Sequence, residues 1–230
     1  MNRLLILFFS LFGVAWCYSQ ENTFKEVDSL YKEDQFYAGV TYNLTGNKPQ
    51  NLSQSGFSLG FHLGFIKDMP INKARNVAIG IGLGYSANSF NQNLLINKDN
   101  TNNFSYSIIE NSNSFSKNKF SNHLIELPIE FRWRSSTPTD YNFWRIYTGF
   151  KFGYVLTHTT KYKGELGSFK YSNNSDFNKL QYGLTLSAGY NTWNVYLYYG
   201  LNPIFSKDAK INGNTIDINA FKIGLMFYVL

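Results

Sequence analysis

The fold is decided by the stretch Val77-Ala78-Ile79-Gly80-Ile81-Gly82-Leu83-Gly84-Tyr85-Ser86, in which large apolar residues alternate with small ones. Successive side chains of a β-strand point to opposite faces, so this period of two predicts a strand with one bulky apolar face. The stretch is rich in glycine, but no helix is expected to follow it. A phosphate-binding loop is therefore not indicated.

The same alternation recurs in eight segments of about ten residues each. They are residues 36–44, 57–65, 77–86, 125–134, 144–156, 180–190, 195–202 and 221–229. This length suits tilted membrane-spanning strands, whereas strands of soluble proteins are typically about 5–6 residues long. The apolar face is bulky and unbroken and the opposite face is small or polar, which favours an apolar exterior. We predict an all-β, eight-stranded antiparallel transmembrane β-barrel.

Composition agrees with this fold class. Charged residues make up 16% of the 230 residues and aromatic residues 18%. An ordinary soluble domain has roughly 25% charged residues. The mean hydropathy of −0.27 excludes a protein built from many transmembrane helices.

The chain divides into three parts. Residues 1–19 resemble a secretory signal peptide, with Arg3, an apolar run over 4–12, and small residues at Cys17 and Ser19 before the expected cleavage site. Residues 20–34 would form a periplasmic N-terminal segment, and residues 35–230 the barrel. Cleavage would remove the only cysteine, which excludes disulfides and thiolate metal sites.

The connections alternate between short and long. Residues 67–76, 134–142 and 191–194 are short, whereas 44–55, 88–121, 157–176 and 202–217 are longer. Outer-membrane barrels have short periplasmic turns and longer extracellular loops. The pattern predicts an integral protein of the cell outer membrane with both termini in the periplasm. The Asn- and Ser-rich connection 88–121 is expected to be mobile.

Charged side chains are expected inside the barrel. The predicted lumen charge network consists of Glu126, Glu130, Arg132, Arg145, Lys151 and Lys222. A barrel of eight strands has room only for side chains, and unpaired buried charges are costly, so these mixed signs should pair. They would lean towards an opposite wall of glycines, namely Gly60, Gly64, Gly80, Gly82 and Gly84. Their role would be structural, and the barrel would not conduct.

Two further sets of residues fit an outer-membrane barrel. The interfacial aromatics, expected where lipid meets water, are Trp133, Tyr141, Trp144, Tyr190 and Trp193. The C-terminal stretch 222–229 resembles the signal read by the barrel assembly machinery, carried by Lys222, Gly224, Phe227 and Val229. That machinery would be a partner during biogenesis.

Few residues indicate chemistry. His62, His123 and His158 lack the spacing of metal ligands, and a tight turn would offset His123 from His158 by roughly four residues. Ser121 and His123 could supply two members of a Ser/His/acid set, without an evident third. We expect no catalytic residues, metal or cofactor, and no nucleic-acid partner. Lysines in the longer connections could meet outer-membrane lipid, in particular the phosphates of lipopolysaccharide. They are Lys98, Lys117, Lys119, Lys161, Lys163, Lys170, Lys179, Lys207 and Lys210.

Two motifs suggest a family. His123-Leu124-Ile125-Glu126-Leu127-Pro128-Ile129-Glu130-Phe131 resembles the "(I/L)ELP" strand of the PorT-like outer-membrane barrels, and residues 147–154 (YTGFKFGY) resemble the strand that follows it. The resemblance covers residues 35–230. The family takes its name from a member needed for type IX protein secretion. We predict a non-enzymatic structural or partner component of an envelope machine, for protein secretion, such as type IX secretion, or for outer-membrane assembly. A narrow solute channel and a barrel that binds at the surface through its loops are the alternatives.

Overall fold

The computed structural model describes residues 32–99, 101, 103–111, 114–135 and 143–229. The predicted signal peptide, most of segment 20–34 and Tyr141 lie outside the described residues. Within them, the regular elements are strands, and no helix is long and apolar enough to cross a membrane. The strands are β1 (Gln35–Gly46), β2 (Leu59–Pro70), β3 (Val77–Asn91), β4 (Leu94–Lys98), β5 (Phe104–Ile108), β6 (Phe115–Arg134), β7 (Trp144–Gly164), β8 (Gly167–Ser172), β9 (Leu180–Tyr190), β10 (Trp193–Gly200), β11 (Lys210–Ile211), β12 (Asn214–Thr215) and β13 (Asn219–Val229).

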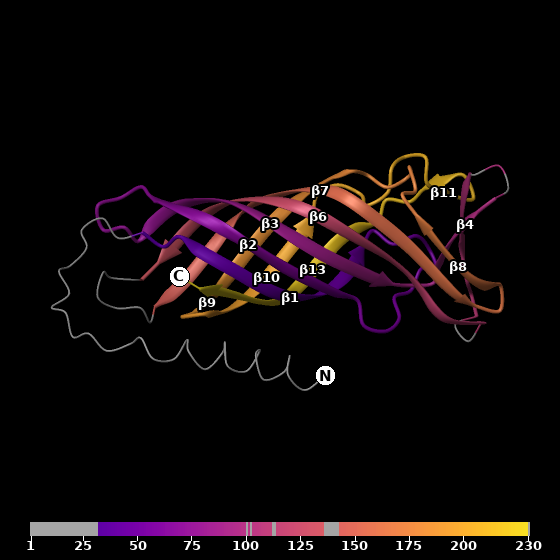
Figure 1. The fold of residues 1–230 in the computed structure, drawn as a ribbon, viewed down its shortest axis with the longest axis horizontal. Coiled ribbons are helices and arrows are strands. Elements are labelled where there is room, and N and C mark those ends of the chain that lie inside the picture. The colour runs from indigo at the N-terminus through magenta and orange to yellow at the C-terminus, as the bar shows by residue number, and fades with distance from the viewer. Residues whose placement is uncertain (1–31, 100, 102, 112–113, 136–142, 230) are drawn as a thin grey trace, which may run out of the picture. The chain divides into compact units, whose positions relative to one another are not determined.

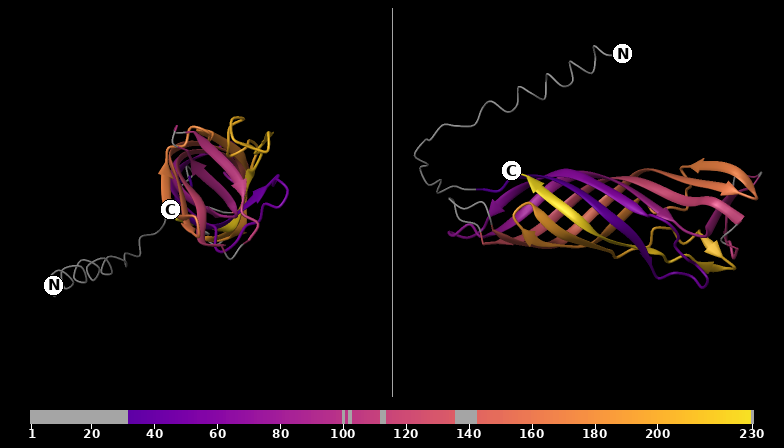
Figure 2. Two further views of the ribbon diagram at one scale, coloured as in Figure 1. Left: turned by 90° about the vertical axis from the view of Figure 1, so that its right-hand side faces the viewer. Right: turned by 90° about the horizontal axis from the view of Figure 1, so that it is seen from below.

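Eight of these strands form a closed antiparallel barrel. Each pairs with its neighbour in the order β1, β2, β3, β6, β7, β9, β10 and β13, and β13 pairs back onto β1 from Phe36↔Val229 to Gly46↔Asn219. Figure 2 shows the ring of strands end-on and their tilt from the side. The predicted eight-stranded barrel is confirmed.

The outer wall carries the predicted apolar face. Along β1 the exposed positions are Phe36, Ala38, Val40 and Tyr42, and the residues between them are buried. Exposed Phe, Leu, Ile and Trp side chains continue around the barrel on every long strand. We call this exposed surface the apolar belt. A contiguous apolar surface of this extent is unfavourable in water and suited to lipid.

The two ends of the barrel differ. At the turn end, short connections at 71–76, 135–143 and 191–192 join the strands, and β1 begins and β13 ends there. At the loop end, β4, β5, β8, β11 and β12 form additional short hairpins (Figure 1). β6 and β7 run further into the loop end than predicted. Their outward residues change there from apolar to Lys, Ser and Thr, so the predicted alternation had ended.

The connection 88–121, expected to be mobile, is ordered over most of its length. β3 continues to Asn91, and β4 pairs with β5 from Leu94↔Ile108 to Lys98↔Phe104. Leu94 and Ile96 are buried. The Asn and Ser residues suggested a loop, but apolar positions within the connection bury themselves against the barrel.

Candidate functional site: a filled barrel interior

Charged side chains fill the barrel interior near the turn end. Asp68 accepts contacts from two arginines, Arg134 Nη1 at 2.8 Å and Arg132 Nη1 at 3.2 Å. Arg132 Nε also donates to Glu130 at 3.1 Å. The side chains of Arg132, Arg134 and Asp68 are fully excluded from solvent. Pairing of this kind is what makes buried charge tolerable.

Glu33, which precedes β1, enters the same cluster. Its carboxylate Oε2 lies 3.8 Å from Arg134 Nη1 and 3.9 Å from Arg145 Nε, and it accepts a hydrogen bond from Gln35 Nε2 at 3.1 Å. Its backbone carbonyl accepts from Arg132. Glu33 was assigned from the sequence to the periplasmic segment 20–34, yet its side chain is buried. Three arginines therefore face three carboxylates in this turn-end cluster, defined as Glu33, Asp68, Glu130, Arg132, Arg134 and Arg145.

A second, central cluster surrounds Glu126. Lys151 Nζ lies 3.1 Å from Glu126 Oε2, His62 Nδ1 lies 3.5 Å from the same oxygen, and Ser86 Oγ donates to Oε1 at 2.7 Å. Lys222 Nζ lies 4.9 Å from the centre of the Tyr198 ring. The ring face attracts a cation and so compensates this lysine for part of its lost hydration.

All six residues of the predicted lumen network point inward and are nearly or fully buried. The structure joins Glu126 to Lys151 and Glu130 to Arg132, and it places Lys222 over an aromatic ring instead of beside a carboxylate. Four residues of the two clusters, Glu33, Asp68, Arg134 and His62, were not among the predicted lumen residues. Asp68 had been assigned to a turn, although it lies within β2 at an inward position. Arg134 and His62 occupied inward positions of predicted strands, so the alternation could have identified them as lumen residues.

The glycine wall is filled differently from what we expected. A methyl group added at Gly64 or Gly84 would collide with the Tyr37 phenol, and one added at Gly82 with Ile66. Only at Gly80 would a charged side chain, that of Arg132, be the first obstacle. The glycines thus make room mostly for uncharged side chains of neighbouring strands. The space lined by Glu130, Lys151 and Tyr196 is too small to hold a water molecule.

An apolar cap closes the loop end. We define it as the buried residues Phe90, Leu94, Ile96, Tyr106, Phe120, Phe177 and Phe205. Phe90 stacks on Phe120 with ring centres 4.8 Å apart, and Phe177 lies 4.5 Å from Phe205. Tyr106 donates a hydrogen bond to Asp176 at 2.8 Å, and burial raises the pKa of its phenol. Aromatic packing of this density leaves little room for a continuous aqueous path.

The histidines do not form a shared site. β6 and β7 pair His123 with Thr157 and Asn122 with His158, so the expected offset of four residues is wrong. The pairs nearest the β6–β7 connection, such as Arg134↔Arg145, already differ from the expected register by two residues. A bulge at Leu156, between the pairs His123↔Thr157 and Leu124↔Val155, adds one more. His123 instead lies on the outer wall and contacts the Tyr85 hydroxyl at 2.6 Å. The part of the chain that the structure describes contains no group of three potential metal ligands. It also places no carboxylate within ion-pair distance of His123.

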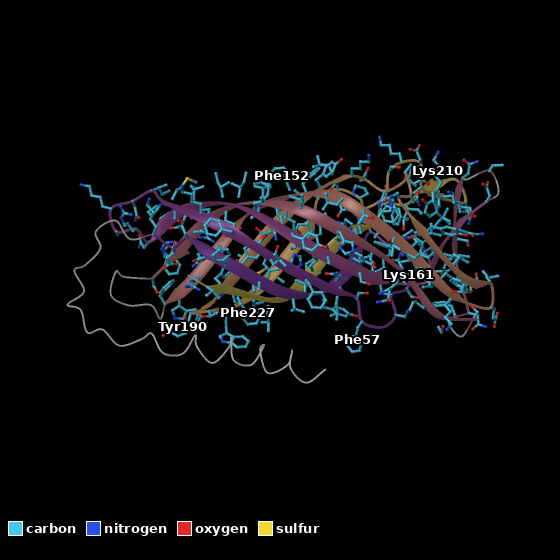
Figure 3. The ribbon with its side chains drawn as sticks, in the orientation of Figure 1. Phe57, Phe152, Lys161, Tyr190, Lys210 and Phe227 are labelled. Atoms are coloured by element: carbon cyan, nitrogen blue, oxygen red, sulfur yellow. The ribbon has the colours of Figure 1, made fainter. Side chains whose placement is uncertain are left out.

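The four predicted interfacial aromatics within the described residues lie on the outer wall near the turn end. Trp144 packs edge-on against Tyr190 with ring centres 5.4 Å apart, and Trp193 packs against Phe227 at 4.8 Å. Trp133 is also exposed. Figure 3 shows Tyr190 and Phe227 at this end and Phe152 projecting from the middle of the wall. In the C-terminal stretch, Phe227 and Val229 lie on the outward face and Lys222 on the inward face.

Comparison with known proteins agrees with this architecture. Residues 18–206 match the family described as "Outer membrane protein beta-barrel domain". The chain belongs to this family. It is therefore an outer-membrane β-barrel protein, while the finer assignment to PorT-like barrels stays a prediction.

Among solved structures, the chain is similar to Ail, the attachment invasion locus protein of Yersinia pestis. Sequence identity is 12%, the match covers 87% of this chain and 100% of Ail, and the TM-score is 0.33. A second structure of Ail, in complex with the heparin analogue sucrose octasulfate, gives 12% identity, the same coverage and a TM-score of 0.35. A search of curated proteins finds no significant match.

Proposed function

We propose that this protein is a non-conducting, non-enzymatic outer-membrane barrel that acts by binding a partner at its loop end, which faces the cell exterior. The observation that carries the proposal is the contrast between a filled interior and an elaborated loop end. The turn-end cluster and the apolar cap occupy the interior at opposite ends. A solute path would need both to open. Buried ion pairs hold the turn-end cluster, and packed aromatic rings hold the apolar cap.

The loop end offers a binding surface. A polar cleft of about 800 Å³ lies between three connections and is lined by Gln50, Asn51, Glu110, Asn212 and Thr215, among others. Asn51 and Asn212 adopt positive φ values of 65° and 50°, which suit tight turns, in two of the connections that line the cleft. Amide, hydroxyl and carboxylate groups of this kind suit a polar ligand. The loop end of the proposed non-conducting barrel carries ordered hairpins. Their order supports a role in recognising a ligand or partner.

The lengths of the connections support the proposed orientation. Short turns face the periplasm in barrels of this class, so the proposal places the loop end outside the cell and the start of β1 and the end of β13 on the periplasmic side. A component of a secretion or assembly machine, including a PorT-like one, would instead offer its turn end or its wall to periplasmic partners. That role stays a second prediction.

Photo-crosslinking in cells that make the protein separates these roles. A photoreactive amino acid would replace Gln50 or Thr215 in the cleft, or Lys73 in the turn between β2 and β3. All three side chains are exposed. The proposal predicts adducts from the two cleft positions and none from Lys73. Adducts confined to Lys73 would refute it in favour of a periplasmic machine.

A further inference from the structure

Five lysines gather on the outer wall of the barrel at the loop end. They are Lys117 and Lys119 on β6, Lys161 and Lys163 on β7, and Lys170 on β8. The strand register sets Lys117 opposite Lys163, Lys119 opposite Lys161, and Lys161 opposite Lys170. We call this set the lysine ladder.

The ladder is electrostatically unbalanced in the structure. Within the described residues, no carboxylate lies within ion-pair distance of any of its five ammonium groups. Like charges directly opposite each other on paired strands are destabilising. Partial burial lowers the pKa of Lys119, and the neighbouring Lys117 and Lys161 lower it further. An anionic ligand would relieve this repulsion.

The position of the ladder indicates where that ligand resides. The apolar belt on β7 ends at Leu156, and Lys161 follows five residues later, about 16 Å along the strand at ordinary strand rise. With a strand tilt of about 40°, the ladder stands roughly 12 Å beyond the belt. Lys161 is exposed between buried neighbours on β7 and lies towards the loop end in Figure 3, so the ladder faces what stands beside the barrel in the membrane. Membrane lipids whose anionic head groups extend far from the bilayer core would reach the height of the lysine ladder.

Two grooves connect the ladder to the belt. The first, of about 310 Å³, is lined by Lys119, Ser121 and His123 together with Phe57, Leu59 and Phe61. The second, of about 440 Å³, is almost entirely apolar and lies between Leu63, Leu83 and Ile125. The contact between His123 and Tyr85 joins them, because His123 lines the first groove and Tyr85 the second. Cationic, polar and apolar surfaces thus follow one another down the wall.

We propose that this wall binds a phosphorylated glycolipid of the outer leaflet, lipopolysaccharide, with its phosphates on the lysine ladder and an acyl chain in the grooves. The proposal shares with the proposed function only the outward direction of the loop end. It does not depend on a ligand in the polar cleft.

Binding can be measured with the purified full chain in detergent, where orientation in a membrane plays no part. The probes would be lipopolysaccharide, the same lipopolysaccharide after removal of its phosphates, and inositol hexaphosphate as a soluble polyanion. The ladder variant is Lys117→Gln/Lys119→Gln/Lys161→Gln. The control variant, Lys48→Gln/Lys207→Gln/Lys210→Gln, removes the same charge from exposed lysines elsewhere at the loop end. Because a lysine near an anionic surface contributes about 1 kcal/mol, we expect the ladder variant to bind roughly a hundred-fold more weakly and the control nearly normally.

Three results would overturn the proposal. They are equal loss in the two variants, equal binding of lipopolysaccharide with and without phosphates, and binding of inositol hexaphosphate as tight as that of lipopolysaccharide. The last would identify a soluble polyanion as the ligand. The comparison of probes uses the unchanged protein, so it tests the proposal even if a variant fails to fold. A Lys→Arg version of the ladder variant should retain binding because it keeps the charge.

Discussion

Arg134 and Asp68 form an ion pair of 2.8 Å inside the barrel, with both side chains completely excluded from solvent. Asp68 comes from β2 and Arg134 from the end of β6, on the far side of β3. The same carboxylate also contacts Arg132 at 3.2 Å. One aspartate thus balances the charge of two arginines. Its replacement would remove a counter-charge from both of them.

Replacing Asp68 with Asn should destabilise the barrel strongly. The change leaves three arginines facing two carboxylates, and the loss of one partner from a buried ion pair costs roughly 3–5 kcal/mol. Urea unfolding of the protein in lipid vesicles, followed by the mobility shift of unheated folded barrels on gels, measures this free energy. Asp208→Asn is the control, because Asp208 is exposed at the loop end. Similar unfolding free energies for the two variants would show that the cluster contributes little.

The barrel itself could be predicted from the sequence because alternation is a local property. Each strand shows its bulky face in its own ten residues, and β9 begins and ends where the pattern does. The extensions of β6 and β7 could not be predicted in this way. Beyond Ile125 and Leu156 the outward residues are polar, and the inward face mixes apolar residues such as Phe120 with polar ones such as Asn122, so the bulky outward alternation is lost.

The filling of the barrel was harder to predict because it depends on register between strands. The β6–β7 pairs nearest the turn end are two residues away from the expected register, and the bulge at Leu156 adds a third. Nothing in the local pattern marks either shift. Glu33 was missed for a related reason. Its role depends on the chain turning into the barrel mouth before β1, which brings it to arginines about a hundred residues away.

Charge on the outer wall should be far more damaging than a small polar change inside. Leu127 and Phe150 are exposed on the apolar belt, so Leu127→Arg and Phe150→Arg should each cost roughly 2–4 kcal/mol. Thr185→Ser, at an inward position, should cost little. Unfolding in vesicles measures all three. Equal tolerance of the two faces would contradict the assignment of the belt to lipid.

Gly84→Ala should destabilise the barrel by roughly 1–3 kcal/mol, the usual cost of forcing atoms into a packed core. The added methyl group would collide with the Tyr37 phenol and lie 2.9 Å from the Leu63 carbonyl oxygen, which belongs to the neighbouring strand. Gly153→Ala is the matched control, because its methyl group would first meet the movable end of the Leu124 side chain. The gel-shift unfolding midpoint should fall more for Gly84→Ala, and the reverse order would contradict the described packing of Tyr37.

Cysteine labelling on whole cells tests the outward direction of the loop end. The sequence contains one cysteine, Cys17, within the predicted signal peptide, so an introduced thiol would stand alone after cleavage. Thr215→Cys at the loop end should react with a membrane-impermeant maleimide on intact cells. Lys73→Cys in the β2–β3 turn should react only after the outer membrane is permeabilised. The opposite pattern would invert the proposed orientation.

The central claim, that the filled interior gives this barrel no conducting path, is tested most directly by recording purified protein in a planar lipid bilayer. The turn-end cluster and the apolar cap predict no steady conductance. The double variant Glu130→Gln/Arg132→Gln should unfold more easily without gaining selectivity for any ion, because it removes one charge of each sign from a structural cluster. Stable, ion-selective single-channel steps from the unchanged protein would contradict the claim and make transport its function.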